Sequence, residues 1–116
     1  MSIEGLQEIC YQLPGVTQEV KLFDHLCFNV GGKTFLFTYP DGSPPSASFK
    51  VPDEDFEEIS AKEGLQPQPY VARYKWVLAM DISSLSRKEW EHYIRQSYNL
   101  IASKLPKKTR KAIGLD

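Results

Sequence analysis

The stretch that most constrains the fold is HLCFNVGGKTFLFTY, residues 25–39. Two runs rich in aromatic and β-branched residues, 25–30 and 33–39, flank the pair Gly31-Gly32. A two-residue primed turn needs positive φ at its central residues, a conformation that glycine adopts without steric cost. The stretch therefore predicts a β-hairpin that turns at the two glycines.

The register of this hairpin follows if the residues next to the turn, Val30 and Lys33, pair with each other. Four large apolar side chains then share one face, whereas the opposite face is mostly polar. The apolar face holds Leu26, Phe28, Phe35 and Phe37, and the polar face holds Cys27, Asn29, Thr34 and Thr38. A slip of one residue would mix the two sets, so the turn and the side-chain pattern support the same pairing.

A helix is expected before the hairpin and a loop after it. Apolar side chains recur at three- and four-residue steps in residues 2–13, which is typical of an amphipathic helix. Pro14 and Gly15 follow this segment and end the helix. On the other side of the hairpin, residues 40–45 (PDGSPP) are rich in turn formers and predict a loop.

Alternation of apolar residues predicts two further strands, at 47–51 and 74–80. The inward side chains of the first are Ala47, Phe49 and Val51, and one face of the second holds Trp76, Leu78 and Met80. Between these strands, an acidic segment that follows Pro52 predicts a short helix, because carboxylates are favourable in the first helical turn. Residues 64–72 show no regular pattern.

The C-terminal part of the chain predicts a long helix followed by a short one. Ser86 and Glu89 form an S-x-x-E capping box, which marks the start of the long helix. Its apolar stripe consists of Trp90, Ile94, Ser97, Tyr98, Ile101 and Leu105. Pro106 ends or bends this helix, and residues 106–113 are expected to form the short one.

The order of these elements is helix, three strands, helix, strand and two helices, which indicates an α+β fold. We expect a two-layer sandwich in which an antiparallel sheet of about four strands has helices packed on one face. The length of 116 residues fits a single domain spanning residues 1–116. A hydrophobic fraction of 41% is sufficient for a packed core.

The composition also restricts the location of the protein. No apolar run approaches the roughly 18 residues needed to span a bilayer, so no membrane contact is expected. The first ten residues, MSIEGLQEIC, lack the basic start and apolar centre of a signal peptide. We therefore expect a cytoplasmic protein. Cys10 and Cys27 are too few for a disulfide framework and are expected to stay reduced.

Candidate catalytic and metal-binding residues are few. His25 and Cys27 lie at i and i+2 on one predicted strand, but no second pair has the spacing that would complete a zinc site. The same pair lacks the orienting carboxylate and the oxyanion hole that a cysteine nucleophile requires. The acidic residues 53–58 lack the ligand spacing and the glycine of a calcium loop.

We therefore expect no catalytic residues, no metal and no cofactor, and hence no enzyme. A remote alternative is an enzyme or small-ligand-binding protein whose cleft contains both His25 and Cys27. A deep pocket around the two side chains would favour that alternative, and burial of Cys27 would count against it.

Positive charge gathers at the C-terminus although the chain carries a net charge of −1. Residues 1–103 hold 14 acidic and 9 basic side chains, whereas residues 104–116 hold 5 basic side chains and one Asp. The five cations are Lys104, Lys107, Lys108, Arg110 and Lys111. Such a segment is either an anion-binding surface or a solvated tail, and charge alone does not decide between them.

A second group of cations lies beside aromatic residues. Arg73 and Lys75 are near neighbours of Tyr70, Tyr74 and Trp76 in the chain. Cations of this kind can contact phosphates, and aromatic rings can stack on bases. The alternative is that Trp76 belongs to the core and that the two cations are its exposed neighbours on a strand.

Several short motifs occur in an order that resembles a known family. They are Leu13-Pro14-Gly15-Val16, Gly31-Gly32-Lys33-Thr34-Phe35, Lys50-Val51-Pro52, Pro69-Tyr70, Lys75-Trp76-Val77, Ser97-Tyr98 and Lys104-Leu105-Pro106-Lys107-Lys108. Their order and spacing are similar to those of the MmcQ/YjbR family of small bacterial proteins, over nearly the whole chain.

The resemblance implies a compact α+β fold of the CyaY-like kind, described for the family as a double-wing DNA-binding motif. It also implies DNA binding as the usual function, and it supplies no agreed catalytic residues. Frataxins share the CyaY-like fold and bind iron through an acidic first helix. Here that helix carries only Glu4 and Glu8, so iron binding is not expected.

The charge distribution and the resemblance together predict a small protein that binds DNA weakly through phosphate contacts. The five C-terminal cations would supply most of these contacts, with Arg73 and Lys75 in a secondary role. The alternative is a protein-interaction module of unknown partner, in which Tyr93 and Tyr98 leave aromatic surface on the last long helix.

Overall fold

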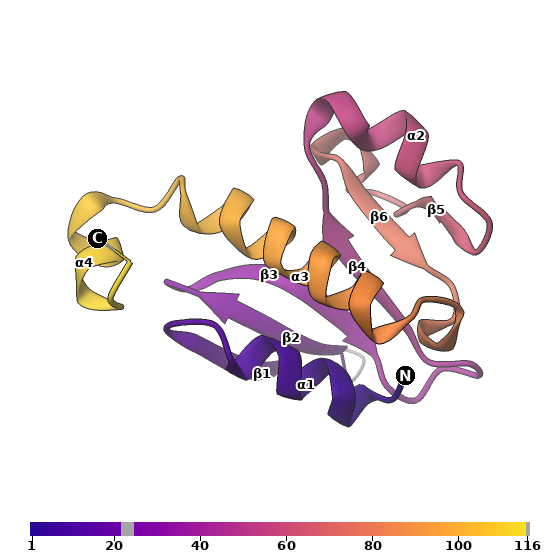
Figure 1. The fold of residues 1–116 in the computed structure, drawn as a ribbon, viewed down its shortest axis with the longest axis horizontal. Helices are drawn as coiled ribbons and strands as arrows, with labels where there is room; N and C mark the ends of the chain where they lie inside the picture. The colour runs from indigo at the N-terminus through magenta and orange to yellow at the C-terminus, as the bar shows by residue number, and fades with distance from the viewer. Residues whose placement is uncertain (22–24, 116) are drawn as a thin grey trace.

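The computed structural model describes residues 1–21 and 25–115 and contains one antiparallel sheet with helices packed on it (Figure 1). The strands are β1 (Val16–Lys21), β2 (His25–Val30), β3 (Lys33–Tyr39), β4 (Ser46–Lys50), β5 (Leu65–Pro67) and β6 (Trp76–Ala79). The helices are α1 (Ile3–Tyr11), α2 (Phe56–Ser60), α3 (Arg87–Ala102) and α4 (Lys107–Ala112), with short 3₁₀ helices η2 (Asp53–Asp55), η3 (Ala72–Tyr74) and η4 (Ile82–Ser84). Among these helices, none combines the length and the apolar character needed to cross a lipid bilayer.

The predicted α+β architecture is confirmed, but the sheet has six strands instead of about four, in the order β1-β2-β3-β4-β6-β5. The two strands that were not predicted, β1 and β5, form its two edges. Every residue of β1 after Val16 is exposed, so the strand shows little apolar alternation. β5 has three residues and ends at Pro67. Edge strands are commonly short or polar, because an apolar edge would invite aggregation.

The register of the hairpin is confirmed next to the turn and wrong beyond it. Val30 pairs with Lys33 as predicted. A β-bulge then adds one residue to β3, so that Phe28 pairs with Leu36 instead of Phe35. Beyond this point each residue of β3 lies on the face opposite to the predicted one.

Two side chains of β3 show the consequence of the bulge. Thr38 lies on the helix-covered face, where it is fully buried and its hydroxyl donates to the Leu26 carbonyl oxygen at 3.1 Å. Phe37 lies on the other face, half-buried, and pairs with Cys27. One extra residue inverts the alternation, and the periodic pattern of the sequence contains no sign of it.

The helix-covered face of the sheet forms the hydrophobic core. The side chains Phe28, Val30, Phe35, Leu36, Ala47, Phe49, Val77 and Ala79 on this face are each 0% exposed. The ring of Phe49 packs on α3, with its centroid 5.7 Å from that of Trp90 and 4.8 Å from that of Tyr93. The predicted inward residues of β4, together with Val51, are all buried.

The opposite face, which we call the open face, carries Cys27, Phe37, Ser48, Lys50, Trp76 and Leu78, and no α-helix of the described residues packs on it. Trp76 and Leu78 share one face of β6 as predicted, but the interpretation that placed Trp76 in the core is wrong. Val77 and Ala79 enter the core, whereas Trp76 is half-buried on the open face and Met80 is 44% exposed. A two-residue period does not say which set meets the helices.

Helix α3 begins at the predicted residue and ties two strands together. The capping box is confirmed, since Ser86 Oγ accepts from the Glu89 amide at 3.1 Å and Glu89 Oε1 accepts from the Ser86 amide at 3.0 Å. Farther along, the buried hydroxyl of Ser97 donates to the Phe35 carbonyl oxygen at 2.6 Å and accepts from the Lys50 amide at 2.9 Å. This hydroxyl joins β3 and β4 beyond the last residues that the two strands pair directly.

Candidate nucleic-acid interface

The basic C-terminal segment is a packed helix and not a loose tail. Leu105 and Thr109 lie against the hairpin turn, where a Cβ on Gly31 would come within 2.6 Å of Leu105 Cδ1. Ile113 lies against the turn after α1, where a Cβ on Gly15 would come within 2.7 Å of its own Cβ. The two glycines therefore allow α4 to dock on the ends of the hairpin and of α1 (Figure 1).

Arg110 has a structural part in this docking. Its Nη1 donates to the carbonyl oxygen of Ser103 at 3.2 Å and to that of Leu105 at 2.9 Å. Carbonyl groups at the end of a helix lack partners within the helix, and a cation that binds them stabilises that end. Arg110 was predicted as a phosphate contact, and in the structure its guanidinium connects α4 to the C-terminus of α3.

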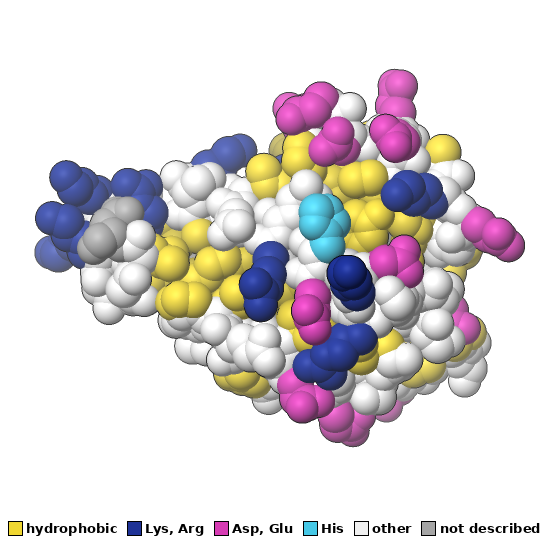
Figure 2. Space-filling view, in the orientation of Figure 1, with side chains coloured by type: hydrophobic (Ala, Val, Ile, Leu, Met, Phe, Trp, Pro, Cys, Tyr) yellow, Lys and Arg dark blue, Asp and Glu magenta, His cyan; other side chains and the backbone are white. Residues whose placement is uncertain are grey.

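The other four cations of the segment, Lys104, Lys107, Lys108 and Lys111, are exposed. Figure 2 shows Lys and Arg side chains gathered at the end of the molecule that α4 forms, and Asp and Glu side chains over α2. The α4 end of the molecule is thus locally positive, although the net charge is only −1. A local concentration of this kind attracts a polyanion to that end.

Arg73 and Lys75 belong to the turn that precedes β6. The guanidinium carbon of exposed Arg73 lies 4.7 Å from the centroid of the Tyr74 ring. Nζ of half-buried Lys75 lies 5.1 Å from the centroid of the Phe56 ring. Both cations therefore rest on aromatic faces, which attract positive charge.

Lys50, which was not predicted as a site residue, lies between the two predicted groups of cations. Its Nζ donates to the carbonyl oxygen of Tyr74. Burial lowers the pKa of the Lys50 ammonium, the nearby charges of Lys104 and Lys75 lower it further, and Asp53 opposes them. Lys50 is thus close enough to both groups to be repelled by each. The sequence signals for it are its place in the motif Lys50-Val51-Pro52 and its alternation with inward-facing Phe49.

A shallow groove of about 290 Å³ continues this basic edge beside the hairpin turn. It runs between the start of β3 and the junction of α3 with α4. Its walls are formed by Lys33, Thr34, Ile101, Lys104, Leu105 and Pro106. Two ammonium groups beside an apolar floor can bind an anionic group, and Lys33 therefore joins the candidate cations.

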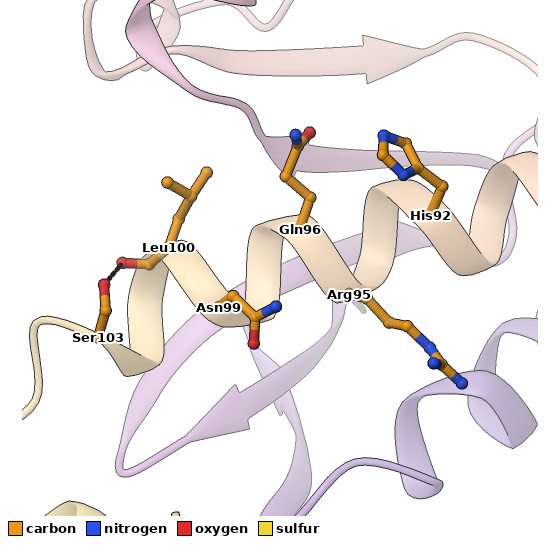
Figure 3. Close-up of a pocket in the computed structure, with 6 residues that line it drawn as sticks. All are labelled: His92, Arg95, Gln96, Asn99, Leu100 and Ser103. Atoms are coloured by element: carbon orange, nitrogen blue, oxygen red, sulfur yellow. Dashed lines mark hydrogen bonds between the residues drawn. The ribbon is translucent and has the colours of Figure 1, made fainter.

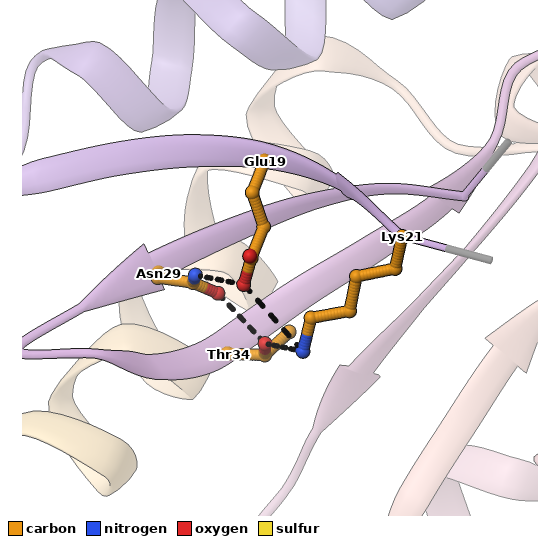
Figure 4. A network of polar contacts seen from close by, with 4 residues as sticks. All are labelled: Glu19, Lys21, Asn29 and Thr34. Carbon is orange, nitrogen blue, oxygen red and sulfur yellow. Dashed lines mark hydrogen bonds and ion pairs between the residues drawn. The ribbon is translucent and has the colours of Figure 1, made fainter.

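A polar network covers the β1 to β3 part of the open face (Figure 4). Asn29 Nδ2 donates to Glu19 Oε1 at 2.8 Å, and the Thr34 hydroxyl donates to Asn29 Oδ1 at 2.7 Å. Lys21 Nζ lies 3.6 Å from Glu19 Oε1 and donates to Thr34 Oγ1 at 3.4 Å. The carboxylate of Glu19 is thus held by partners of its own, which reduces its repulsion of an anion.

One face of α3 carries an open hollow. It has a volume of about 400 Å³ and is lined by His92, Arg95, Gln96, Asn99, Leu100 and Ser103. Figure 3 shows that these side chains leave one helix in different directions. Within the part of the chain that the structure describes, no group of three His, Cys, Asp or Glu side chains is placed to hold a metal ion.

His25 and Cys27 share the open face of β2. Cys27 is 4% exposed, and burial raises the pKa of its thiol above the ordinary value. A cysteine nucleophile requires the opposite shift, because the thiolate is the reactive form. The ring of His25 packs on Tyr39, with 4.1 Å between the ring centroids. Burial of Cys27 therefore counts against the alternative of an enzyme at this position.

The aromatic surface predicted on the last long helix does not exist. Tyr93 is 5% exposed and stacks on Phe49, and Tyr98 is 2% exposed. The Tyr98 hydroxyl donates to the carbonyl oxygen of Pro14 at 2.5 Å. Both rings belong to the core, so the protein-interaction alternative loses the residues on which it was based.

Comparison with known proteins identifies the family. A family model described as YjbR matches residues 11–100. Among solved structures, the chain is similar to the Deinococcus radiodurans protein DR2400, a DUF419 domain, with a TM-score of 0.85 and 25% sequence identity over 99% of this chain and 89% of that one. No functionally curated protein matches the chain. Because the family model matches most of the chain, the protein belongs to the YjbR family, as its motifs predicted.

Proposed function

We propose that this protein binds DNA weakly, through contacts between lysine side chains and the phosphate backbone. The main contacts come from Lys104, Lys107, Lys108 and Lys111, and further contacts come from Lys33, Lys50, Arg73 and Lys75. Arg110 holds α4 in place and contributes its charge to the same end of the molecule. Contacts of this kind position a nucleic acid and carry little sequence information.

The observation that carries the proposal is the position of Lys50. Its Nζ donates to the carbonyl oxygen of Tyr74, the residue between Arg73 and Lys75, and the charge of Lys104 lowers the pKa of its ammonium. Lys50 therefore interacts with both the C-terminal cations and those before β6. Cations linked in this way suit a polyanion, whose charges repeat along a line.

Repulsion among these lysines supports an anionic ligand. Lys107 and Lys111 are four residues apart, so they are neighbours on one side of α4 and repel each other unless an anion screens them. Lys50 experiences the same repulsion from Lys104 and Lys75. Bound phosphate groups would reduce the repulsion at both places, and this reduction would contribute part of the binding free energy.

The experiment is a titration of a fluorescein-labelled duplex at several salt concentrations, followed by anisotropy. About four neutralised phosphates give a slope of log K against log salt of roughly −3 to −4. The double variant Lys107→Glu/Lys111→Glu removes two contacts. It is expected to weaken binding about tenfold or more at low salt and to reduce the slope by about 2.

The matched control is Lys88→Glu/Arg95→Glu, which changes the net charge by the same amount. Both residues are exposed on α3, and Lys88 lies in its first turn, far from α4. This control is expected to leave the slope unchanged. The proposal fails if the protein binds no duplex at low salt, or if both double variants lose the same affinity.

A further inference from the structure

The open face holds a continuous aromatic surface that the phosphate contacts leave unused. The rings of His25 and Tyr39 are 4.1 Å apart between centroids, those of Tyr39 and Phe37 are 6.1 Å apart, and those of Phe37 and Trp76 are 5.2 Å apart. All four side chains are half-buried, although their counterparts on the helix-covered face are closed off from water. These four rings are partly accessible to solvent on the face of the sheet that the helices leave uncovered.

The aromatic surface lies next to the basic edge. Lys50 pairs with Trp76 across β4 and β6, so the two side chains lie on the open face together. The segment before β6 borders the same face, because the side chain of Gln68 accepts a hydrogen bond from Ser48 and the Tyr74 carbonyl oxygen accepts one from Lys50. A nucleic-acid strand whose phosphates contact the lysines therefore has its bases within reach of the aromatic rings.

We propose that the open face binds the unstacked bases of a single-stranded nucleic acid, with Phe37, Tyr39 and Trp76 as the stacking surface. This inference rests on the proposed function, since the lysines hold the backbone beside the rings. Every base has a π face, so stacking on aromatic side chains tolerates any sequence. In a duplex the bases stack on one another inside the helix, and the open face gains no contact with them.

The charge of the face suits this ligand better than an apolar protein partner. Lys50 pairs with Trp76 and Lys21 pairs with His25, so the two lysines border the aromatic surface, and Lys21 Nζ also lies 3.6 Å from Glu19 Oε1. An apolar partner would have to bury these cations, whereas a phosphodiester chain pairs with them.

The test compares oligothymidine with a duplex of the same length in the same anisotropy assay. Phe37→Thr removes a ring from the centre of the aromatic surface and introduces a residue that suits a strand. It is expected to weaken oligothymidine binding about tenfold and to leave duplex affinity within about twofold. Unchanged duplex binding also shows that the variant is folded.

Tryptophan fluorescence is a second readout, because the chain has two tryptophans in different surroundings. Trp90 is 0% exposed and its Nε1 donates to the Ile82 carbonyl oxygen at 2.8 Å, so it is shielded from ligands. Stacking of a base on Trp76 is expected to quench the emission of the wild-type protein. Trp76→Phe keeps an aromatic ring, so it is expected to retain the affinity within about threefold and to lose the quenching.

The outcomes separate this inference from the proposed function. The inference is overturned, while phosphate binding stands, if Phe37→Thr lowers the affinity for neither nucleic acid or for both equally, and if oligothymidine does not quench the tryptophan fluorescence. If neither nucleic acid binds at low salt, both fail. If Phe37→Thr converts a dimer to a monomer in sedimentation and leaves oligothymidine affinity unchanged, a second copy of the chain covers the face, and the inference is again overturned.

Discussion

The two faces of the sheet are made from the same strands, yet their large side chains differ in solvent exposure. On the helix-covered face the large side chains, such as Phe28 and Phe49, are 0% exposed. On the open face Phe37 and Trp76 remain half-buried, beside the polar network of Glu19, Lys21, Asn29 and Thr34. The helices α1, α2 and α3 make this difference, because they cover one face alone. The comparison teaches that stability is concentrated on one face, which leaves the other available for binding.

The largest expected effect contrasts two phenylalanines. Phe49→Ala removes a fully buried ring that packs on Trp90 and Tyr93, so it should lower the free energy of unfolding by about 3–5 kcal/mol. Phe37→Ala removes a half-buried ring on the open face and should cost about 1 kcal/mol. Urea unfolding of both variants measures the difference. Equal losses of unfolding free energy would show that Phe37 stabilises the fold as much as a core residue does.

A pair of glycines tests whether the helix layer extends to α4. Gly31 has a φ of 56°, and a Cβ there would lie 2.6 Å from Leu105 Cδ1, whereas Gly32 has a φ of 79° and no atom within 4 Å of such a Cβ. Gly31→Ala should therefore cost about 2–3 kcal/mol, because backbone strain is joined by a clash with the segment before α4. Gly32→Ala should cost about 1 kcal/mol from strain alone. Thermal unfolding of the two variants measures the difference. Equal losses of stability would mean that Leu105 and α4 can shift away from the added Cβ without destabilising the fold.

Two hydroxyl groups extend the contrast to hydrogen bonds. Ser97→Ala breaks two buried bonds that join β3 and β4, and the loss should be about 1–3 kcal/mol. Thr34→Ala breaks bonds of the network on the open face, where water replaces the lost partner, and should cost less than about 1 kcal/mol. Chemical denaturation compares the two. A larger loss of stability for Thr34→Ala would contradict the view that the hydrogen bonds of the open face contribute less than those of the helix-covered face.

The smallest effect concerns the solvated rim of the helix layer, where Glu89 caps α3. Hydrogen bonds from the backbone and side chain of Ser86 lower the pKa of the Glu89 carboxyl. A lowered pKa in the folded state stabilises the protein above the unfolded value of about 4.3, and this stability is lost as the pH falls through the folded value. Because the carboxyl is exposed, solvent screens much of this effect, and the free energy of unfolding of the wild type should exceed that of Glu89→Gln by no more than about 0.5 kcal/mol at neutral pH. The two free energies should converge in acid, once the carboxyl is protonated in the folded state. A difference that does not depend on pH would exclude the charge as its source.

Features that depend on a few neighbouring residues were predicted correctly. Gly31 and Gly32 form the hairpin turn because their backbone conformation is unavailable to most other residues at low cost. Ser86 and Glu89 begin α3 because each satisfies an amide of the other at the helix start. In both cases the physical cause lies within four residues of the chain, so the sequence contains it.

Features that depend on distant contacts were not predicted. The bulge opposite Phe28 left no trace in the alternation, and it moved Phe37 to the open face. One interpretation of the sequence placed Trp76 in the core, although Val77 and Ala79 are the residues that meet the helices. Only the position of α2 and α3 over the sheet decides which of two alternating sets is buried.

The candidate site divides in the same way. The sequence by itself determined the family, the α+β class and the group of C-terminal lysines, since these depend on composition, order and local pattern. The tertiary structure alone decided that Arg110 connects α4 to α3 and that Lys50 joins two groups of cations far apart in the chain. The reason is that a charge acts through space, and folding sets the distances between residues that the sequence keeps apart.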